Sequence, residues 1–268
     1  MKFGCILSTY DSRDFKLKAS ATATDVPDEY SCPLKMSVKN QGQVGSCVAH
    51  AVSSILEYHA VPEQKLSTNF IYGLQKKLFN REGEGMMLRD ACKIAADYGD
   101  MCLEDCPGNT EVPNCYKVAE DAFADSAKLA KASEYRILKY FLCSSNKDIK
   151  YAIYNYGPVL ASIRWYDTFK VSRDGILSGV QTGSFGNHAI VIYGYTKDGF
   201  LCQNSWGSNW GKDGRFFLPN RVKIREARGF VDWNGTDELK EPSTGSVWNL
   251  LYKCFNAIVN LITKLLNK

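Results

Sequence analysis

A chain of 268 residues and 30.0 kDa is long enough to bury a substantial core without disulfide bonds, as one domain or as two packed lobes. Hydrophobic residues make up 45% of the chain and charged residues 23%, a composition that excludes a disordered or fibrous protein. The net charge of +4 is too small, and the Lys and Arg residues are too scattered, to indicate nucleic-acid binding.

The first residues carry no export signal, because the apolar run after Lys2 is too short for one. We therefore expect a cytoplasmic protein, in which disulfides are uncommon, so the ten cysteines do not by themselves predict a disulfide framework. Cys102, Cys106 and Cys115 could form a zinc half-site or a local bridge. Their spacing matches no familiar metal motif, which favours buried or loop thiols. We predict no metal and no cofactor.

Residues 1–24 are polar and rich in small residues, and we expect them to form an N-terminal arm without a core of its own. The folded body begins at residue 25 and is mainly helical up to Cys143. Apolar positions and capping residues predict helices over residues 47–58, 68–78 and 86–98.

The second half changes in texture. A short helix is expected over residues 147–156, and strands are expected over residues 159–165, 188–195, 200–204 and 215–218. A helical half followed by a strand half predicts an α+β fold with two segregated lobes.

The segment 246–268 has an amphipathic helical pattern. Lys253 and Lys264 interrupt its apolar run, which is far shorter than the roughly 20 residues needed to span a bilayer. This helix could pack on the body, lie on a membrane surface or bind a partner protein.

The segment 41–51, QGQVGSCVAHA, can supply a nucleophile and an oxyanion donor. Cys47 lies at the predicted start of a helix, whose partial positive charge lowers the pKa of a thiol. The N–H of Cys47 and the side-chain amide of Gln41 could both donate to a developing oxyanion.

The segments 186–191, GNHAIV, and 204–211, NSWGSNWG, can supply a base and the residue that orients it. His188 is the candidate base, and Asn204 could accept a hydrogen bond from its other ring N–H, shielded from water by Trp206. His50 is the rival base, but it lies on the same helix as Cys47 and has no evident orienting partner. His59 is expected to be structural or exposed.

These blocks closely resemble those of the papain-like cysteine peptidases. The resemblance includes the spacing of Gln41 from Cys47 and of His188 from Asn204, and it extends loosely from residue 26 to residue 218. It implies a helical left lobe, an antiparallel β-barrel-like right lobe and a catalytic cleft between them. It also implies a peptidase domain over residues 25–240.

The same resemblance suggests that Gly85, in a turn before a helix, and Trp206 contact the substrate. Two positions depart from the family pattern: Val48 replaces the usual tryptophan, and Val44 replaces a cysteine of a familiar disulfide. The start of the chain resembles a short-armed subgroup without a long propeptide, known from microbes and viruses. By that resemblance, residues 1–24 are expected to lie over the cleft and restrain it.

The sequence therefore predicts a thiol peptidase that hydrolyses peptide bonds through Cys47, His188, Asn204 and Gln41 by way of a thioester acyl-enzyme. Its partners would be protein or peptide substrates. The alternatives are a catalytically silent papain-fold binding module and a papain-fold acyltransferase. Peripheral membrane association or packaging in a virion are the alternatives to a cytoplasmic location.

Overall fold

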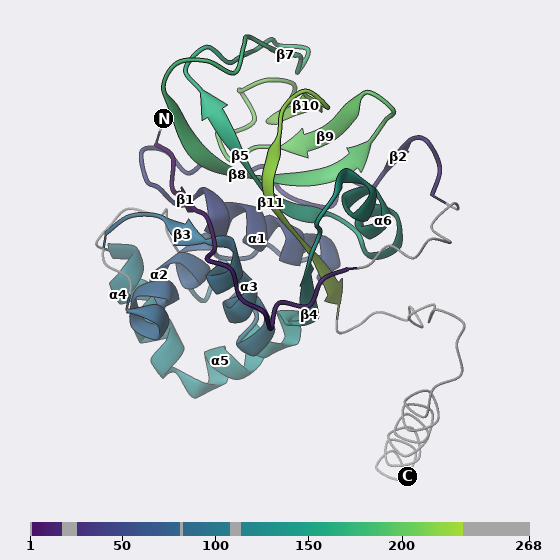
Figure 1. Ribbon diagram of the computed structural model, residues 1–268. Helices are drawn as coiled ribbons and strands as arrows, with labels where there is room; N and C mark the ends of the chain where they lie inside the picture. Colours follow the sequence, from purple (N-terminus) through teal and green to yellow (C-terminus); the bar gives the residue numbers. More distant parts are fainter. Residues whose placement is uncertain (1, 18–25, 81–82, 108–113, 233–268) are drawn as a thin grey trace, which may run out of the picture. The chain divides into compact units, whose positions relative to one another are not determined.

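The computed structural model describes residues 2–17, 26–80, 83–107 and 114–232. All of them belong to one compact unit, Met1–Asn234. Its helices α1–α5 gather on one side and its main sheet on the other (Figure 1). The predicted tail helix over residues 246–268 lies outside the described residues.

The central helix of the fold is α1 (Cys47–His59), in which every residue from Cys47 to Glu57 is buried. Its apolar and small side chains allow close packing on all sides, and its core cluster includes Leu160 and Ala189 from the sheet. The helix that carries Cys47 is therefore held against both lobes.

The other helices complete the helical lobe. Ser67 caps α2, because its side chain accepts a hydrogen bond from the N–H of Phe70, and Asp125 caps α5 in the same way. The bounds are α2 (Thr68–Phe79), α3 (Leu88–Asp97), α4 (Asn114–Ala124), α5 (Ser126–Ala132) and the 3-10 turn Ser133–Tyr135.

The main sheet is antiparallel and has the strand order β10-β9-β8-β5-β11-β4, with β2 paired to β8. Its described strands form an open path rather than a closed barrel. The bounds are β2 (Tyr30–Ser31), β4 (Ile137–Leu142), β5 (Val159–Tyr166), β8 (Phe185–Tyr195), β9 (Gly199–Gln203), β10 (Arg215–Pro219) and β11 (Ile224–Asp232). Helix α6 (Asn146–Tyr156) packs on this sheet, and β6 (Lys170–Val171) pairs with β7 (Leu177–Ser178).

The structure confirms the α+β fold, and the predicted helices and strands are present with shifts of a few residues. One prediction was wrong at its start: Met86–Met87 form the strand β3, and the helix begins only at Leu88. The sequence analysis also missed β4 and β11, two adjacent strands of the sheet.

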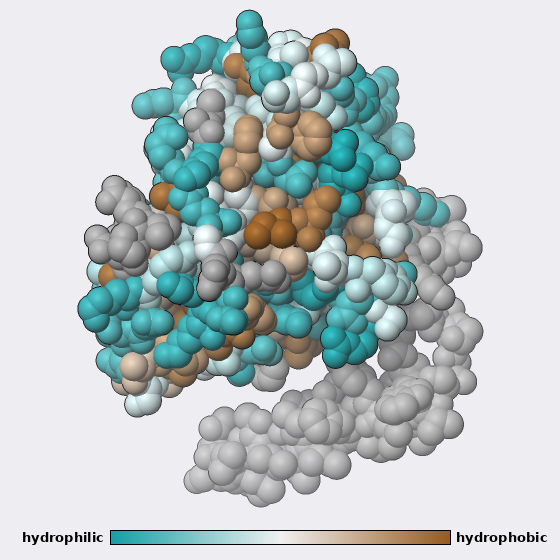
Figure 2. Space-filling view, turned by 60° about the vertical axis from the view of Figure 1, so that its left-hand side comes forward, coloured by the Kyte–Doolittle hydropathy of each residue, from teal (hydrophilic) through white to brown (hydrophobic). Residues whose placement is uncertain are grey.

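The N-terminal arm runs along the outside of the body. Its strand β1 (Cys5–Ile6) pairs in parallel with β3, and the arm then continues past α3 to β4 (Figure 1). There Leu17 donates to the carbonyl of Leu142, whose N–H donates to Phe15. Figure 2 shows that apolar side chains gather in the middle of the face that lies to the left in Figure 1. Ile6 of the arm is 36% exposed.

Candidate active site

Cys47 is the first residue of α1, and a tight loop leads into it. Gly42 has a φ of 57°, a conformation that favours glycine, and Val44 donates to the carbonyl of Gln41 at 3.2 Å. The sulfur of Cys47 accepts a hydrogen bond from the N–H of Ala189 at 3.5 Å, so the thiol lies beside the strand that carries His188. The described residues leave Cys47 with no exposed surface.

His188 and Asn204 come from neighbouring parts of the sheet. The Nε2 of His188 lies 2.8 Å from the Oδ1 of Asn204, an oxygen that also accepts the N–H of Ser205 at 2.8 Å. Because a carbonyl oxygen can only accept, Nε2 carries the proton and Nδ1 is the free ring nitrogen. Nδ1 is buried and has no hydrogen-bond partner among the described residues.

Aromatic rings surround this pair. Trp206 stacks on His188 with ring centroids 4.7 Å apart and an interplanar angle of 28°, and Trp165 meets the imidazole edge-on at 5.8 Å. These rings hold the imidazole plane and keep water from the bond to Asn204.

Gln41 is 2% exposed and is held from both ends. Its Oε1 accepts the hydroxyl of Ser205 at 2.6 Å, and its Nε2 donates to the carbonyl of Val44 at 2.8 Å. The second hydrogen of Nε2 goes to the carbonyl of Lys2 at 2.9 Å. A carbonyl of the arm therefore occupies the donor that the sequence analysis assigned to an oxyanion.

Residues 2–6, called here the covering segment, lie over Cys47, His188 and Gln41. The ring of Phe3 meets His188 edge-on at 5.7 Å, and the N–H of Gly4 hydrogen bonds to the sulfur of Cys47. Cys5 is buried, and its thiol lies 3.1 Å from the hydroxyl of Ser162. The carbonyl of Gly4 accepts the N–H of Met86 at 2.8 Å.

Burial keeps the two reactive groups neutral in this covered form. It raises the pKa of Cys47, although the N–H groups of Ala189 and Gly4 partly offset the rise. It lowers the pKa of His188 to about 4, although the bond to Asn204 favours the charged ring. A thiolate–imidazolium pair is therefore disfavoured while the arm is in place.

The two other histidines lie apart from this chemistry. His50 is buried, and its Nδ1 lies 2.9 Å from the carbonyl of Ser46 on its own helix. Burial lowers the pKa of His50 to about 4. His59 ends α1, and its ring meets that of Tyr58 edge-on.

Gly85 and Trp206, the two predicted substrate contacts, both lie against the covering segment. Gly85 has a φ of 101°, and a Cβ there would lie 2.9 Å from the carbonyl of Gly4. The ring of Trp206 lies 6.4 Å from that of Phe3. Sequence reasoning missed Ser205, which ties Gln41 to Asn204; its place directly after Asn204 was the available signal.

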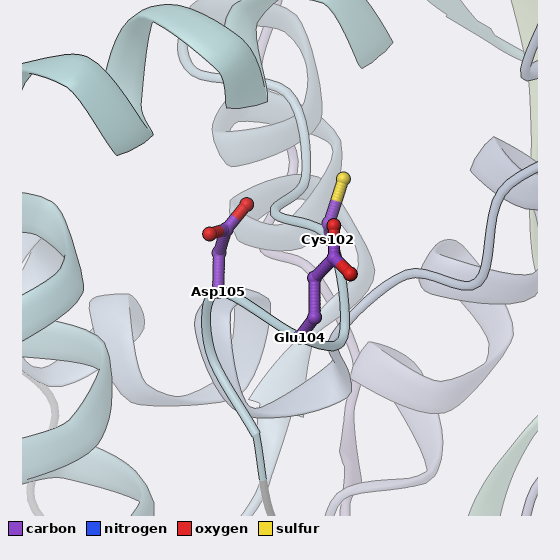
Figure 3. Close-up of side chains that lie close together, drawn as sticks. All are labelled: Cys102, Glu104 and Asp105. Atoms are coloured by element: carbon purple, nitrogen blue, oxygen red, sulfur yellow. The ribbon is translucent and has the colours of Figure 1, made fainter.

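Outside this site, one loop gathers groups that could hold a cation. Figure 3 shows Cys102, Glu104 and Asp105 on this loop. Their ligand atoms all lie within 4.8 Å of one another. The ammonium of Lys131 lies 3.2 Å from Glu104 and 2.8 Å from Asp105, so a lysine already forms ion pairs with both carboxylates. The three cysteines of the possible zinc half-site are free and buried: Cys102, Cys106 and Cys115.

Within the part of the chain that the structure describes, no helix is long and apolar enough to cross a membrane.

Comparisons with known proteins identify the family of this chain. The model of the papain family cysteine proteases matches residues 22–227. An uncharacterized peptidase C1-like protein of Acanthamoeba polyphaga mimivirus is 26% identical over 248 residues, which are 82% of this chain and 79% of that protein. Falcipain-2b of Plasmodium falciparum is 27% identical over 194 residues, 66% of this chain but only 38% of the relative.

Solved structures share the fold. Xylellain, a cysteine protease from Xylella fastidiosa, has a TM-score of 0.73 at 22% identity, covering 86% of this chain and 96% of that one. Procathepsin B S9 from Trypanosoma congolense has a TM-score of 0.65 at 18% identity, covering 85% of each chain. With the family model matched over most of its length, this chain belongs to the papain family of cysteine proteases.

Proposed function

We propose that this chain is a thiol peptidase in which Cys47 is the nucleophile and His188 the base. The observation that carries the proposal is the 2.8 Å contact between Nε2 of His188 and Oδ1 of Asn204. It leaves Nδ1 as the nitrogen that can take a proton, on the strand whose Ala189 N–H already contacts the sulfur of Cys47.

In the proposed reaction, Nδ1 of His188 takes the proton of Cys47 and the thiolate attacks the peptide carbonyl carbon. The N–H of Cys47 and Nε2 of Gln41 donate to the oxyanion. The imidazolium then protonates the leaving amine, and a thioester remains on the sulfur. Water activated by His188 hydrolyses this thioester and restores the free thiol.

We further propose that the N-terminal arm inhibits this reaction. The covering segment uses the same donors as a substrate carbonyl would, since Gln41 donates to Lys2. The group that it presents to the sulfur is the N–H of Gly4 rather than a carbonyl carbon. The segment therefore blocks the thiol without offering it a bond to attack.

An epoxide directed at active-site thiols tests the peptidase proposal. We expect one equivalent of label on Cys47 in the wild-type chain and more rapid labelling in Gly4→Ala, because a Cβ at residue 4 would clash with the carbonyl of Gly45 and disfavour docking of the arm. Peptide hydrolysis should disappear with labelling. Cys47→Ala is the control and should take up no label at this position.

If the epoxide labels neither the wild type nor Gly4→Ala, that result contradicts the peptidase proposal and favours a binding module. Formation of amide products with an added amine in place of hydrolysis would favour an acyltransferase.

Acid should favour the open form. Burial lowers the pKa of His188 to about 4 in the covered form, whereas an imidazole open to water has a pKa near 6.5. The open form therefore binds protons more tightly, and the advantage of the covered form, complete above pH 6.5, is lost as the pH falls towards 4. Each pH unit in this window changes the balance by up to about 1.4 kcal/mol.

The ratio of wild-type to Gly4→Ala labelling rates measures this effect, because the intrinsic reactivity of the thiol cancels. We expect the ratio to rise several-fold between pH 7.5 and pH 5.5. A constant ratio over that range would show that His188 does not respond to the arm.

A further inference from the structure

The arm has a second attachment at Asp14, eight residues after the end of the covering segment. The carboxylate of Asp14 accepts hydrogen bonds from two guanidinium groups. Nε and Nη2 of Arg89 lie 3.1 and 2.6 Å from its two oxygens, and Nη1 and Nη2 of Arg228 lie 3.3 and 3.0 Å from the same two oxygens. Paired contacts of this kind are the geometry in which arginine binds a carboxylate most specifically.

The three side chains are largely withdrawn from water. The exposed fractions of the side chains are 2% for Arg228 and 9% for both Arg89 and Asp14. Arg89 belongs to α3 and Arg228 to β11, so the carboxylate joins the helical side of the molecule to the sheet. These two buried arginines require an anion beside them, because a buried charge without a partner is strongly unfavourable.

Asp14 is one of the two carboxylates that form ion pairs with the two arginines of this cluster. Glu226 lies 2.7 Å from Nε of Arg228 and supplies one negative charge, and Asp14 supplies the second. Burial tends to raise the pKa of Asp14, but the hydrogen bonds from the two arginines outweigh it, and the pKa lies below its usual value. Asp14 is thus fully charged at neutral pH.

The neighbouring residues of the arm make contacts that are less specific than the paired hydrogen bonds of Asp14. The carbonyl of Thr9 accepts Nη2 of Arg89, and the Ser8 N–H donates to Glu226 at 2.9 Å. At its far end the arm pairs with Leu142 through backbone groups, Leu17 packs on the apolar core, and the ammonium of Lys139 lies over the ring of Phe15. Asp14 is therefore the side chain of the arm that makes paired contacts with two buried arginines.

We propose that Arg89 and Arg228 form a carboxylate-binding site, separate from the catalytic residues, which holds Asp14 and thereby keeps the covering segment over Cys47. The proposal rests on the proposed function, since it concerns how that site is regulated. The arm acts as a ligand with two attachment points on one chain. Occupation of the carboxylate site keeps the covering segment at a high local concentration beside the thiol, as in bivalent binding.

A cavity of about 470 Å³ adjoins the carboxylate site and is lined in part by Asp14, Arg89 and Arg228. Solvent can therefore reach the ion pairs once Asp14 moves. The carboxylate site can open without prior disruption of the core, and the arm can leave by separating at Asp14.

The variant Asp14→Asn tests the proposal in the full chain. It keeps the shape of the side chain and removes the charge. We expect the labelling rate of Cys47 to rise at least ~10-fold, a modest share of what a second attachment point contributes. Hydrogen exchange at the amide of Met86, which Gly4 protects in the wild type, should accelerate by a similar factor.

Asp11→Asn is the matched control, with the same chemical change three residues away. The partner of Asp11 is Arg13 of the arm itself, whose side chain is 84% exposed. We expect labelling and exchange in this variant to equal those of the wild type. Equal behaviour of Asp14→Asn and Asp11→Asn would overturn the proposal.

The exchange measurement does not depend on catalysis, so the two proposals can fail separately. Absence of labelling in every variant, with faster exchange in Asp14→Asn, would reject the peptidase and keep the carboxylate site. Rapid labelling of Gly4→Ala together with wild-type behaviour of Asp14→Asn would reject the carboxylate site alone. Thermal unfolding of each variant checks that the body is intact.

Discussion

Replacing Gly4 by alanine should uncover the active site and raise the initial rate of peptide hydrolysis by about tenfold or more. A Cβ at this position would lie 1.8 Å from the carbonyl oxygen of Gly45, closer than any real contact. The oxygen belongs to the backbone of the loop that leads into Cys47, so it cannot move aside cheaply. Overpacking of this kind costs about 1–3 kcal/mol, and each 1.4 kcal/mol corresponds to a factor of ten in the open fraction.

The body should be unaffected, because Gly4 contacts it only when the arm is docked. The measurement is the rate of cleavage of a fluorogenic peptide from the first seconds of the assay, with Cys47→Ala in the same background as a blank. Tyr10→Ala is the matched control: it lies in the same arm, is 81% exposed and should behave as wild type. A Gly4→Ala chain no faster than the wild type would refute inhibition by the covering segment.

Removing the side-chain amide of Gln41 should lower kcat by about 10²–10³, the usual cost of losing one oxyanion donor. The test belongs in the Gly4→Ala background, because in the wild type Gln41 also holds the carbonyl of Lys2. In the wild-type background, the loss of this docking contact would open the site and mask part of the loss of catalysis. We expect KM to change little, since the donor acts mainly on the charge that develops in the transition state.

Gln43→Ala is the control for Gln41→Ala, because Gln43 lies two residues away in the same loop and its side chain is exposed. It should keep the kcat of its background. A decrease in KM and kcat together, or equal effects of the two variants, would remove Gln41 from the proposed oxyanion site. The free energy of unfolding of each variant separates a local effect from a loss of structure.

Two residues of the candidate site, Cys47 and Asn204, could be placed from the sequence because they stand at the ends of regular elements. Cys47 follows a glycine-rich loop at a helix start, and Asn204 directly follows a strand, so local patterns indicated where each would lie. The spacing between Gln41 and Cys47 could also be read within one short segment. What brought these blocks together was the family resemblance, since spacing alone does not determine which strand faces the helix.

The missed elements have long-range causes. In β11, Arg228 is almost fully buried. A charged residue at a buried position breaks the hydrophobic pattern by which a strand is predicted. Its partner Asp14 is 214 residues away in sequence, and no local pattern connects the two. Met86–Met87 followed a helical pattern but pairs instead with Cys5–Ile6 of the arm. The strand β11 is set by its pairing with β4 and β5, and β3 by its pairing with the arm, so both depend on contacts far away in sequence.

The packing of aromatic rings around His188 has an optical consequence. Trp165, Trp206 and Trp210 form one cluster, three of the five tryptophans in the chain. Phe3 of the covering segment closes one side of it at Trp206. Departure of the arm would let water reach this indole, and the emission of the protein would shift to longer wavelength. Intrinsic fluorescence would then follow the opening of the site in real time, with no substrate or label present.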